Sequence, residues 1–233
     1  KKGNEIEEEI EDKYVFIIDE INRGNISKIF GELITLLEKD KREGNGGFAL
    51  KLPYSGEDFI IPENVYIIGT MNTADRSIAM MDIALRRRFI FEEFMPKVNL
   101  IKEYVEDIPL RAIIQGINDK IAVLHGRDYQ IGHSYFMDRN LKTIDDLKQV
   151  WFYHIIPLLN EYFYEEWDKL MAIIGPFIER PRKVKGLDKL HLQSSNLYSF
   201  KSHDITNVEF IELMKKINAV DLPEGEELEE DAA

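Results

Sequence analysis

Two acidic residues and a neutral amide each follow an apolar segment of this sequence, and together they could bind a phosphate and a water molecule. Asp19 and Glu20 end the run at 14–18, and Asn72 stands beyond the run at 65–68. An acid at the carboxyl end of a buried strand can support Mg²⁺, and a following Glu can polarise an attacking water. An amide can hold that water or a phosphate oxygen without adding charge. These residues indicate phosphate chemistry at one edge of a sheet.

Asp75 and three consecutive arginines are further candidates. Asp75 comes three residues after Asn72, where it could link the site to a neighbour or cap a helix. The arginines at 86–88 suit a helix end, where they complement the helix dipole. Alternatively, one of them could enter the site of an adjacent subunit and stabilise the transition state. Asp19, Glu20 and Asn72 could also have ordinary structural roles, because strands often end in exposed acids and Asn is common in turns.

The elements that must position these residues form an α/β arrangement. Unbroken apolar runs at 14–18 and 65–68 predict strands buried on both faces, as in a parallel sheet, and 89–91 predicts a third strand. Two other elements are expected in this part of the chain: a helix over 26–37 that Asn25 caps, and a β-hairpin over 48–61.

The sequence becomes helical in character beyond Pro96. Apolar residues at helical spacing predict a long helix over 110–124. Another helix begins near Leu147, and Pro157 should kink it or start a new one. A terminal helix is expected at 208–217. The chain therefore divides near residue 96 into an α/β part and a helical part.

Composition restricts the class of protein. The net charge is −13, but residues 1–12 contribute −4 and residues 221–233 contribute −7, which leaves −2 for the rest. A protein that grips nucleic acid unaided usually has a net basic face, so we expect DNA contacts only through domains or partners outside this chain. Cysteine is absent, which excludes disulfides and thiolate metal sites. No apolar run suits a membrane span and no secretory signal opens the chain, so we expect a cytoplasmic protein without membrane contacts.

The candidate residues lie in segments that resemble one known family. They are similar to the AAA+ domain of McrB, the GTP-hydrolysing motor of restriction systems that cut DNA containing methylated cytosine. The resemblance covers most of the chain, about residues 13–165. The segments that carry it are VFIIDEINRGN (15–25), PENVYIIG (62–69), GTMNTADRS (69–77), ALRRRF (84–89), IGHSYF (131–136) and PLLNEYF (157–163).

The resemblance implies roles for Asp19, Glu20, Asn72 and Asp75. Asp19 and Glu20 match the Walker B pair, with Asp19 assisting Mg²⁺ through water and Glu20 positioning the attacking water. Asn72 is similar to the family's sensor residue, and Asp75 belongs to the same signature. Asp19, Glu20 and Asn72 would act on a bound nucleotide, GTP by the resemblance and ATP as the alternative, and Asp75 is a further catalytic candidate.

The resemblance also implies contributions from a neighbouring subunit and from the lid. Arg87 and Arg88 match the arginines offered to the next copy in a ring, whereas Arg86 is the less suitable finger. Gly132 and His133 fall where the lid meets the nucleotide in the family, although they could equally be a turn and a satisfied core histidine.

The implied fold class is α/β, part of a P-loop NTPase (AAA+) parallel sheet followed by an α-helical lid. The implied parts are an acidic lead-in (1–12), the AAA+ α/β subdomain (13–96), the helical lid (97–185), a C-terminal helical extension (186–220) and an acidic tail (221–233).

The implied activity is that of a homo-oligomeric ring that hydrolyses GTP and drives an McrC-like nuclease subunit along DNA. An ATP-dependent protein remodeller of the MoxR or midasin groups and a catalytically silent AAA+ assembly module are the alternatives. The sequence departs from the family in one respect, since it lacks the phosphate-binding motif G-x-x-x-x-G-K-S/T. We expect that motif upstream of residue 1, and we expect the 233 residues alone to bind nucleotide poorly.

Overall fold

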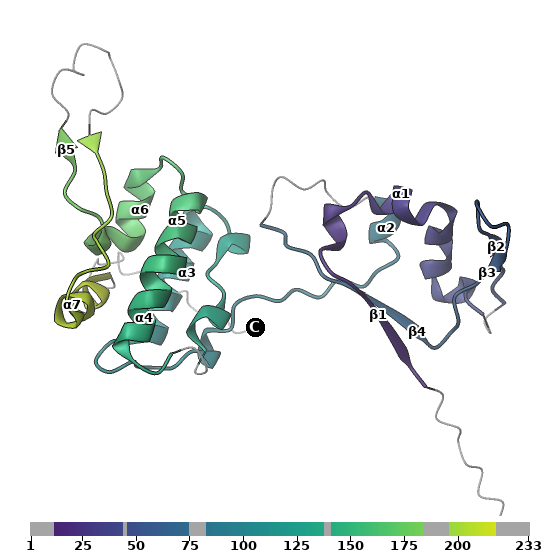
Figure 1. The fold of residues 1–233 in the computed structure, drawn as a ribbon, viewed down its shortest axis with the longest axis horizontal. Helices are drawn as coiled ribbons and strands as arrows, with labels where there is room; N and C mark the ends of the chain where they lie inside the picture. The colour runs from purple at the N-terminus through teal and green to yellow at the C-terminus, as the bar shows by residue number, and fades with distance from the viewer. Residues whose placement is uncertain (1–11, 44–45, 75–82, 138–140, 184–195, 218–233) are drawn as a thin grey trace, which may run out of the picture. The chain divides into compact units, whose positions relative to one another are not determined.

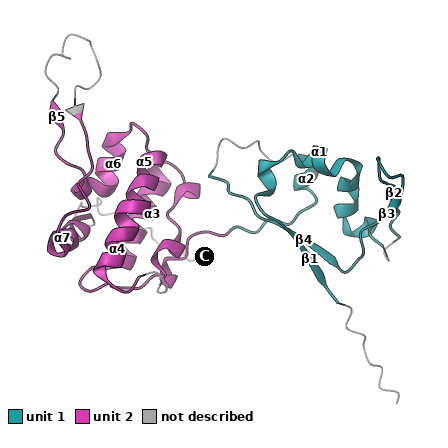
Figure 2. Ribbon diagram, viewed as in Figure 1, with its two compact units in different colours: residues 1–93 teal, residues 94–233 magenta. Residues whose placement is uncertain are grey.

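The computed structural model describes residues 12–43, 46–74, 83–137, 141–183 and 196–217. The chain divides into two compact units, residues 1–93 and 94–233 (Figure 2). The division lies close to the boundary expected near residue 96, and each unit has its own hydrophobic core.

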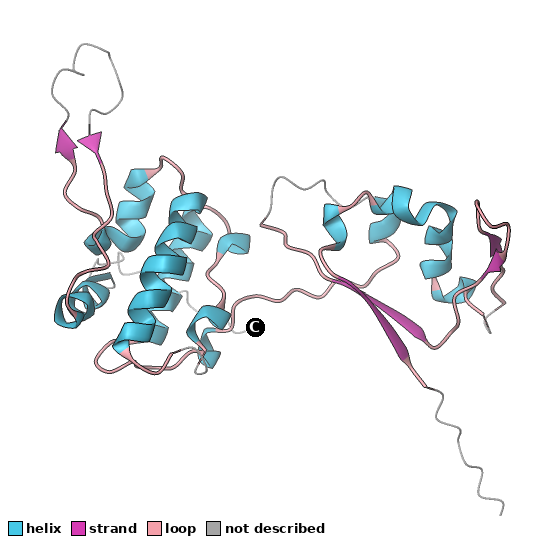
Figure 3. Ribbon diagram, viewed as in Figure 1, coloured by secondary structure: helices cyan, strands magenta, loops and turns pink. Residues whose placement is uncertain are grey.

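Unit 1 is mixed α/β, and its elements are shown in Figures 1 and 3. Its described elements are β1 (Tyr14–Ile18), η1 (Ile21–Arg23), α1 (Ile26–Phe30), η2 (Gly31–Leu37), η3 (Lys39–Lys41), β2 (Leu50–Lys51), β3 (Asp58–Phe59), β4 (Val65–Gly69) and α2 (Ile83–Arg86), where η marks 3₁₀ turns.

Strands β1 and β4 pair in parallel, as the apolar runs predict, with Tyr14 opposite Val65 and Ile18 opposite Gly69. The predicted hairpin is also confirmed, because β2 and β3 pair antiparallel. The β1–β4 pair carries the candidate residues at its carboxyl end.

The expectation that both faces of these strands are buried is wrong within this structure. Side chains alternate along a strand, and opposite residues of a parallel pair share a face. Val65 and Ile67 lie over the core of unit 1. The other face holds Ile17 and Ile68, which are 65% and 51% exposed. Even on the face of Val65 and Ile67, Phe16 is 58% exposed, so in the described part of the chain the core of unit 1 covers only part of one face.

Phe89–Phe91 is not a strand, contrary to the prediction. The described residues give it no hydrogen-bonded partner, and Ile90 is almost fully exposed. An apolar run needs a neighbouring strand to satisfy its backbone groups, and the sequence pattern does not show whether one is present.

Asn25 caps α1 as predicted, since its side chain accepts a hydrogen bond from the Lys28 N–H at 3.1 Å. The expected single helix is divided at Gly31, whose φ of 52° and ψ of −130° suit only glycine. The apolar stripe continues into η2, where Leu36 and Leu37 are buried.

Unit 2 is predominantly helical (Figure 3). Its described elements are η4 (Val98–Leu100), α3 (Leu110–Leu124), η5 (Arg127–Tyr129), η6 (His133–Phe136), α4 (Ile144–Val150), the π-helical turn η8 (Trp151–Ile155), α5 (Ile156–Tyr162), α6 (Trp167–Ile174), η9 (Gly175–Phe177), β5 (Arg182–Lys183), β6 (Asn196–Leu197) and α7 (Asn207–Ile217).

The helices of unit 2 follow their sequence signals closely. The predicted helix over 110–124 is α3, and its apolar stripe is buried from Leu110 to Ile121, with Leu124 partly buried at its end. Pro157 lies in the first turn of α5, directly after the π-helical turn. Pro157 has no N–H to donate, and the turn before it departs from the regular α-helical hydrogen-bond pattern, with the Ile156 N–H bonded to Trp151 O.

Helix α7 confirms the expected terminal helix and belongs to the same core as the lid helices. Phe210, Leu213, Met214 and Ile217 pack into the cluster that α3 and α4 form. Of the extension expected at 186–220, α7 therefore packs into the core of unit 2, whereas residues 184–195 and 218–233 lie outside the described chain.

Candidate active site at the ends of the paired strands

The chain turns sharply where β1 ends. Glu20 has φ 52° and ψ 48°, a left-handed conformation that costs a side-chain-bearing residue about 1–2 kcal/mol. The ladder between the strands continues through this turn, because the Thr70 N–H donates to Ile18 O at 3.0 Å and the Ile21 N–H donates to Thr70 O at 2.8 Å. Ile21 is buried and anchors the turn from the other side.

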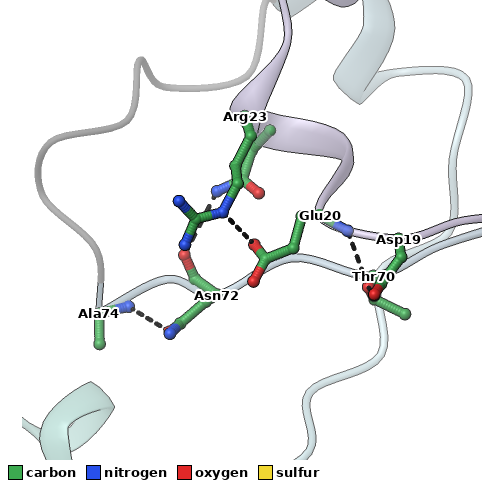
Figure 4. Close-up of polar contacts among 7 residues, drawn as sticks. Asp19, Glu20, Arg23, Thr70, Asn72 and Ala74 are labelled. Carbon is green, nitrogen blue, oxygen red and sulfur yellow. Dashed lines mark hydrogen bonds and ion pairs between the residues drawn. The ribbon is translucent and has the colours of Figure 1, made fainter.

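The hydroxyl of Thr70 contacts both acidic residues. Its Oγ1 accepts a hydrogen bond from the Glu20 N–H at 3.1 Å. The same hydroxyl donates a short hydrogen bond to Asp19 Oδ1 (Figure 4). The two acids at the end of β1 are thus fixed to the first residue after β4.

Asn72 lies at the same rim of the sheet as the acid pair. The Asn22 side-chain amide donates to the Asn72 carbonyl oxygen at 3.3 Å, which ties the loop after β1 to the loop after β4. Asn72 Oδ1 accepts from the Ala74 N–H at 3.0 Å, a turn of the kind that Asn favours. The amide oxygen is therefore occupied, and the Nδ2 group remains to donate to a ligand.

Glu20 forms an ion pair with Arg23 across the single turn of η1. Arg23 Nε lies 3.3 Å from Glu20 Oε2, and the two side chains are 56% and 36% exposed. Figure 4 shows the Glu20 carboxylate between Arg23 and Thr70, on the side of the strand ends where Asn72 lies. The ion pair fixes the direction of the carboxylate.

The three arginines at 86–88 lie in different surroundings. Arg86 stacks on Phe91, with its guanidinium carbon 5.1 Å from the ring centroid. Arg87 is exposed. Arg88 Nε lies 2.9 Å from Glu38 Oε1, and the Arg88 side chain is only 7% exposed.

The predicted role of Arg88, as an arginine offered to another copy, requires this ion pair to open. A guanidinium buried in an ion pair within its own unit would have to lose that pair before it could reach a neighbour. Arg87 remains a candidate for that role. Asp75 lies outside the described residues.

Gly132 and His133 lie in unit 2 at the start of η6. His133 Nδ1 accepts a hydrogen bond from the Lys97 N–H at 3.2 Å. Gly132 has φ −64° and ψ 138°, a conformation open to other residues. These contacts fit the alternative of a turn and a satisfied histidine; a nucleotide-binding role for either residue stays a prediction.

The residues at the strand ends fit a magnesium-bound nucleotide phosphate. Among the described residues no group of three or more His, Cys, Asp and Glu side chains gathers to form a metal cage. Mg²⁺ commonly takes only one or two carboxylates and fills its other positions with water and substrate phosphate. Asp19 offers one carboxylate, whose Oδ1 is already bonded to Thr70, so Oδ2 would face the ion or its water.

Sequence reasoning missed three residues of this region: Asn22, Arg23 and Thr70. Thr70 follows β4 as Asp19 follows β1, and the register places their strands' last residues opposite each other. That register depends on pairing across 51 residues of sequence, which the pattern of either strand does not specify. The signal available was the Thr beside Asn72 in the segment GTMN.

The comparisons with known proteins agree with both units. Residues 3–89 match the family described as AAA domain (dynein-related subfamily), and residues 109–171 match the McrB alpha-helical lid domain. The chain is 42% identical over 179 residues to the type IV methyl-directed restriction enzyme EcoKMcrB subunit of Escherichia coli (strain K12). It is 30% identical over 89 residues to the type II restriction enzyme BsuMI component YdiS of Bacillus subtilis (strain 168).

The matches cover different shares of each protein. The first takes in 68% of this chain and 39% of the E. coli protein, and the second 34% of this chain and 26% of the B. subtilis protein. This chain thus spans well under two thirds of either relative. Separately, none of the helices in the described residues has the length and apolar character that a membrane crossing requires.

Proposed function

The chain joins an AAA domain to a helical lid domain of the McrB kind, and from that premise we propose that it is the motor part of a GTP-hydrolysing subunit in a restriction system. The observation that carries the proposal is the meeting of Asp19, Glu20 and Asn72 at one end of the β1–β4 pair. Open α/β sheets bind their ligands at this carboxyl edge.

The proposed reaction is attack of water on the γ-phosphorus of a nucleoside triphosphate. The water oxygen forms a bond to phosphorus as the bond to the bridging oxygen breaks, and the diphosphate leaves. Glu20 polarises the water and accepts its proton. Asn72 Nδ2 donates to a γ-phosphate oxygen, which stabilises negative charge without adding a cation.

Asp19 would hold Mg²⁺, through water, with the oxygen that Thr70 leaves available. The ion neutralises charge on the phosphate oxygens when it is bound. We assign to Arg87 the role of the arginine that enters the site of an adjacent copy, since Arg88 is occupied by Glu38. The active protein on this proposal is a homo-oligomeric ring.

GTP, the nuclease partner and the DNA substrate are proposed from similarity to the E. coli restriction subunit. No described contact selects guanine over adenine. An ATP-driven remodeller is therefore the outcome to be distinguished, and turnover of GTP and ATP by the full-length protein distinguishes them directly. Preference for GTP, with stimulation by a nuclease subunit, is the expected result.

Glu20→Gln in the full-length protein tests the site itself. The variant should bind nucleotide as the wild type does, while turnover falls by about 10²–10⁴-fold, the usual contribution of general-base catalysis. Glu63→Gln is the matched control, because Glu63 is an exposed glutamate of the same unit. Unchanged turnover in Glu20→Gln, or an equal loss in Glu63→Gln, would overturn the assignment.

A further inference from the structure

One hydroxyl group joins the two acidic residues of the proposed site. Thr70 Oγ1 lies within hydrogen-bond distance of the Glu20 N–H and of Asp19 Oδ1. The backbone of Thr70 also continues the strand ladder on both sides, to Ile18 O and from the Ile21 N–H. Thr70 therefore makes four hydrogen bonds at this rim, two through its hydroxyl and two through its backbone.

The direction of each hydrogen bond is fixed by chemistry. A backbone N–H can only donate, so the hydroxyl accepts from Glu20, and its single hydrogen is left for the carboxylate of Asp19. A hydrogen bond to an ionised carboxylate is stronger than one between neutral groups. Thr70 thus selects which of the Asp19 oxygens faces outward.

The contact with Glu20 acts on the backbone. Glu20 occupies the left-handed region at φ 52°, which is unfavourable for a residue with a side chain. The hydrogen bond from its N–H to Thr70 compensates part of that cost and fixes the angle at which the Glu20 side chain leaves the turn.

We infer that Thr70 is a positioning residue of the proposed hydrolysis, an inference that rests on the proposed function. Its hydroxyl aligns Asp19 toward Mg²⁺ and holds the turn that directs Glu20 toward the water. One side chain therefore couples the metal side of the site to the water side. Thr70 acts through these two acids and does not itself touch the reacting atoms.

The test compares Thr70→Val with Thr70→Ser in the full-length protein. Valine keeps the shape of threonine and removes the hydroxyl, whereas serine keeps the hydroxyl and removes the methyl group. Thr70→Val should lower kcat by about 10–100-fold, the range that loss of a group supporting a metal ligand causes. It should also raise the Mg²⁺ concentration needed for half-maximal turnover. Thr70→Ser should stay near the wild type in both measurements.

Two controls keep the outcomes separate. Thr35→Val makes the same chemical change in η2 of unit 1 and should leave turnover unchanged. Thermal unfolding of Thr70→Val checks whether the variant is folded, and the Mg²⁺ dependence reports on positioning even where stability falls. Equal impairment of the Val and Ser variants, or a Val variant with wild-type kcat and Mg²⁺ dependence, overturns the inference.

The failure of the proposed function gives a different result. If the wild type hydrolyses neither GTP nor ATP, or if Glu20→Gln retains full turnover, the motor assignment falls and the role of Thr70 falls with it. If Glu20→Gln is inactive while Thr70→Val is as active as the wild type, the motor assignment stands and only the role of Thr70 is refuted.

Discussion

The two units of this chain bury their apolar residues to very different extents. Among the described residues, the core of unit 2 contains 27 buried hydrophobic residues, whereas the core of unit 1 contains six. Unit 1 instead exposes large apolar side chains along β1, among them Phe16 at 58%. The proposed chemistry lies in unit 1, so the residues that react and the residues that provide most of the burial belong to different units.

The difference teaches that apolar sequence alone does not produce burial. The stripe of α3 is buried because α6, α7 and η4 pack against that helix within unit 2. The run in β1 is equally apolar, but in the described residues neither of its faces is fully covered, since Phe16 and Ile17 point to opposite faces and are 58% and 65% exposed. A strand pair needs layers on both sides, whereas an amphipathic helix needs only one.

Replacing one phenylalanine in each unit by alanine tests this comparison, and it gives the largest expected change in unfolding free energy. Phe210→Ala in unit 2 removes a fully buried ring and should cost about 3–5 kcal/mol of unfolding free energy in the 233-residue chain. Phe16→Ala in unit 1 should cost far less. Both tryptophans, Trp151 and Trp167, lie in unit 2, so denaturant unfolding of the Phe210 variant is followed by tryptophan fluorescence. The Phe16 variant is followed by far-UV circular dichroism, which detects both units. Similar losses in the two variants would break the comparison.

Substitution of Arg42, in unit 1, should give the next largest loss of stability. It is one of two buried polar residues in the described chain, and its guanidinium donates to Leu37 O at 3.0 Å and to Val65 O. Arg42→Met keeps the aliphatic stem but leaves two carbonyl groups without their donor. We expect a loss of about 2–3 kcal/mol, the cost of removing charged hydrogen bonds.

The measurement for Arg42→Met is far-UV circular dichroism together with tryptophan fluorescence. The loss should be seen by circular dichroism, which detects both units, and the fluorescence transition of unit 2 should be unchanged. Exposed Arg180→Ala is the control. A shift of the fluorescence transition equal to the shift in circular dichroism would show that the units unfold together.

Asp146 should make a smaller contribution to the stability of unit 2, and this contribution depends on pH. Hydrogen bonds from the backbone N–H groups of Lys142 and Thr143, and then from the Thr143 hydroxyl, hold the pKa of Asp146 below its ordinary value of 3.8. Because the pKa is lower in the folded state, the Asp146 carboxylate contributes fully to the stability of the fold above about pH 4. That contribution is lost as the pH falls further. Asp146→Asn should therefore flatten the acid side of the stability profile of unit 2.

The check for Asp146 is the denaturation midpoint between pH 6 and pH 3, followed by tryptophan fluorescence. Exposed Asp168→Asn is the control, because it lies in the same unit outside the capping box. An identical pH profile for the wild type and Asp146→Asn would contradict the prediction.

How far the sequence predicted this structure also differs between the units. The spacing of apolar residues specified α3 and the Asn25 side chain specified the start of α1, because both signals are local. The fold class followed from two parallel strands and is confirmed. The structure places Asn72 at the rim where Glu20 lies (Figure 4). The catalytic roles of these residues stay predictions.

The features that sequence did not predict all depend on distant contacts. The ion pair of Arg88 with Glu38 joins residues 50 positions apart, and nothing in the run of three arginines distinguishes Arg88 from its neighbours. Thr70 acquires its role from strand register. The failed strand at 89–91 shows the same limit, since a strand is defined by its partner.

Arg23→Ala has the smallest expected effect on stability, and it tests whether a residue of unit 1 can matter for turnover without mattering for stability. The ion pair with Glu20 is exposed, so its removal should alter the unfolding free energy of the 233-residue chain by less than about 0.5 kcal/mol. In the full-length protein the same change should lower turnover roughly tenfold, since a catalytic group held less firmly spends less time in the reactive geometry. Arg23→Lys retains a cation and should recover part of that loss.

A double variant shows whether Arg23 acts through Glu20. If it does, Arg23→Ala should have little further effect in a Glu20→Gln background, because the carboxylate that it orients is already gone. Additive losses would mean that Arg23 contacts the nucleotide independently. An appreciable loss of stability in Arg23→Ala would instead make Arg23 a structural residue of unit 1. The proposed catalytic residues and the residues that stabilise the fold would then be less clearly divided between the two units.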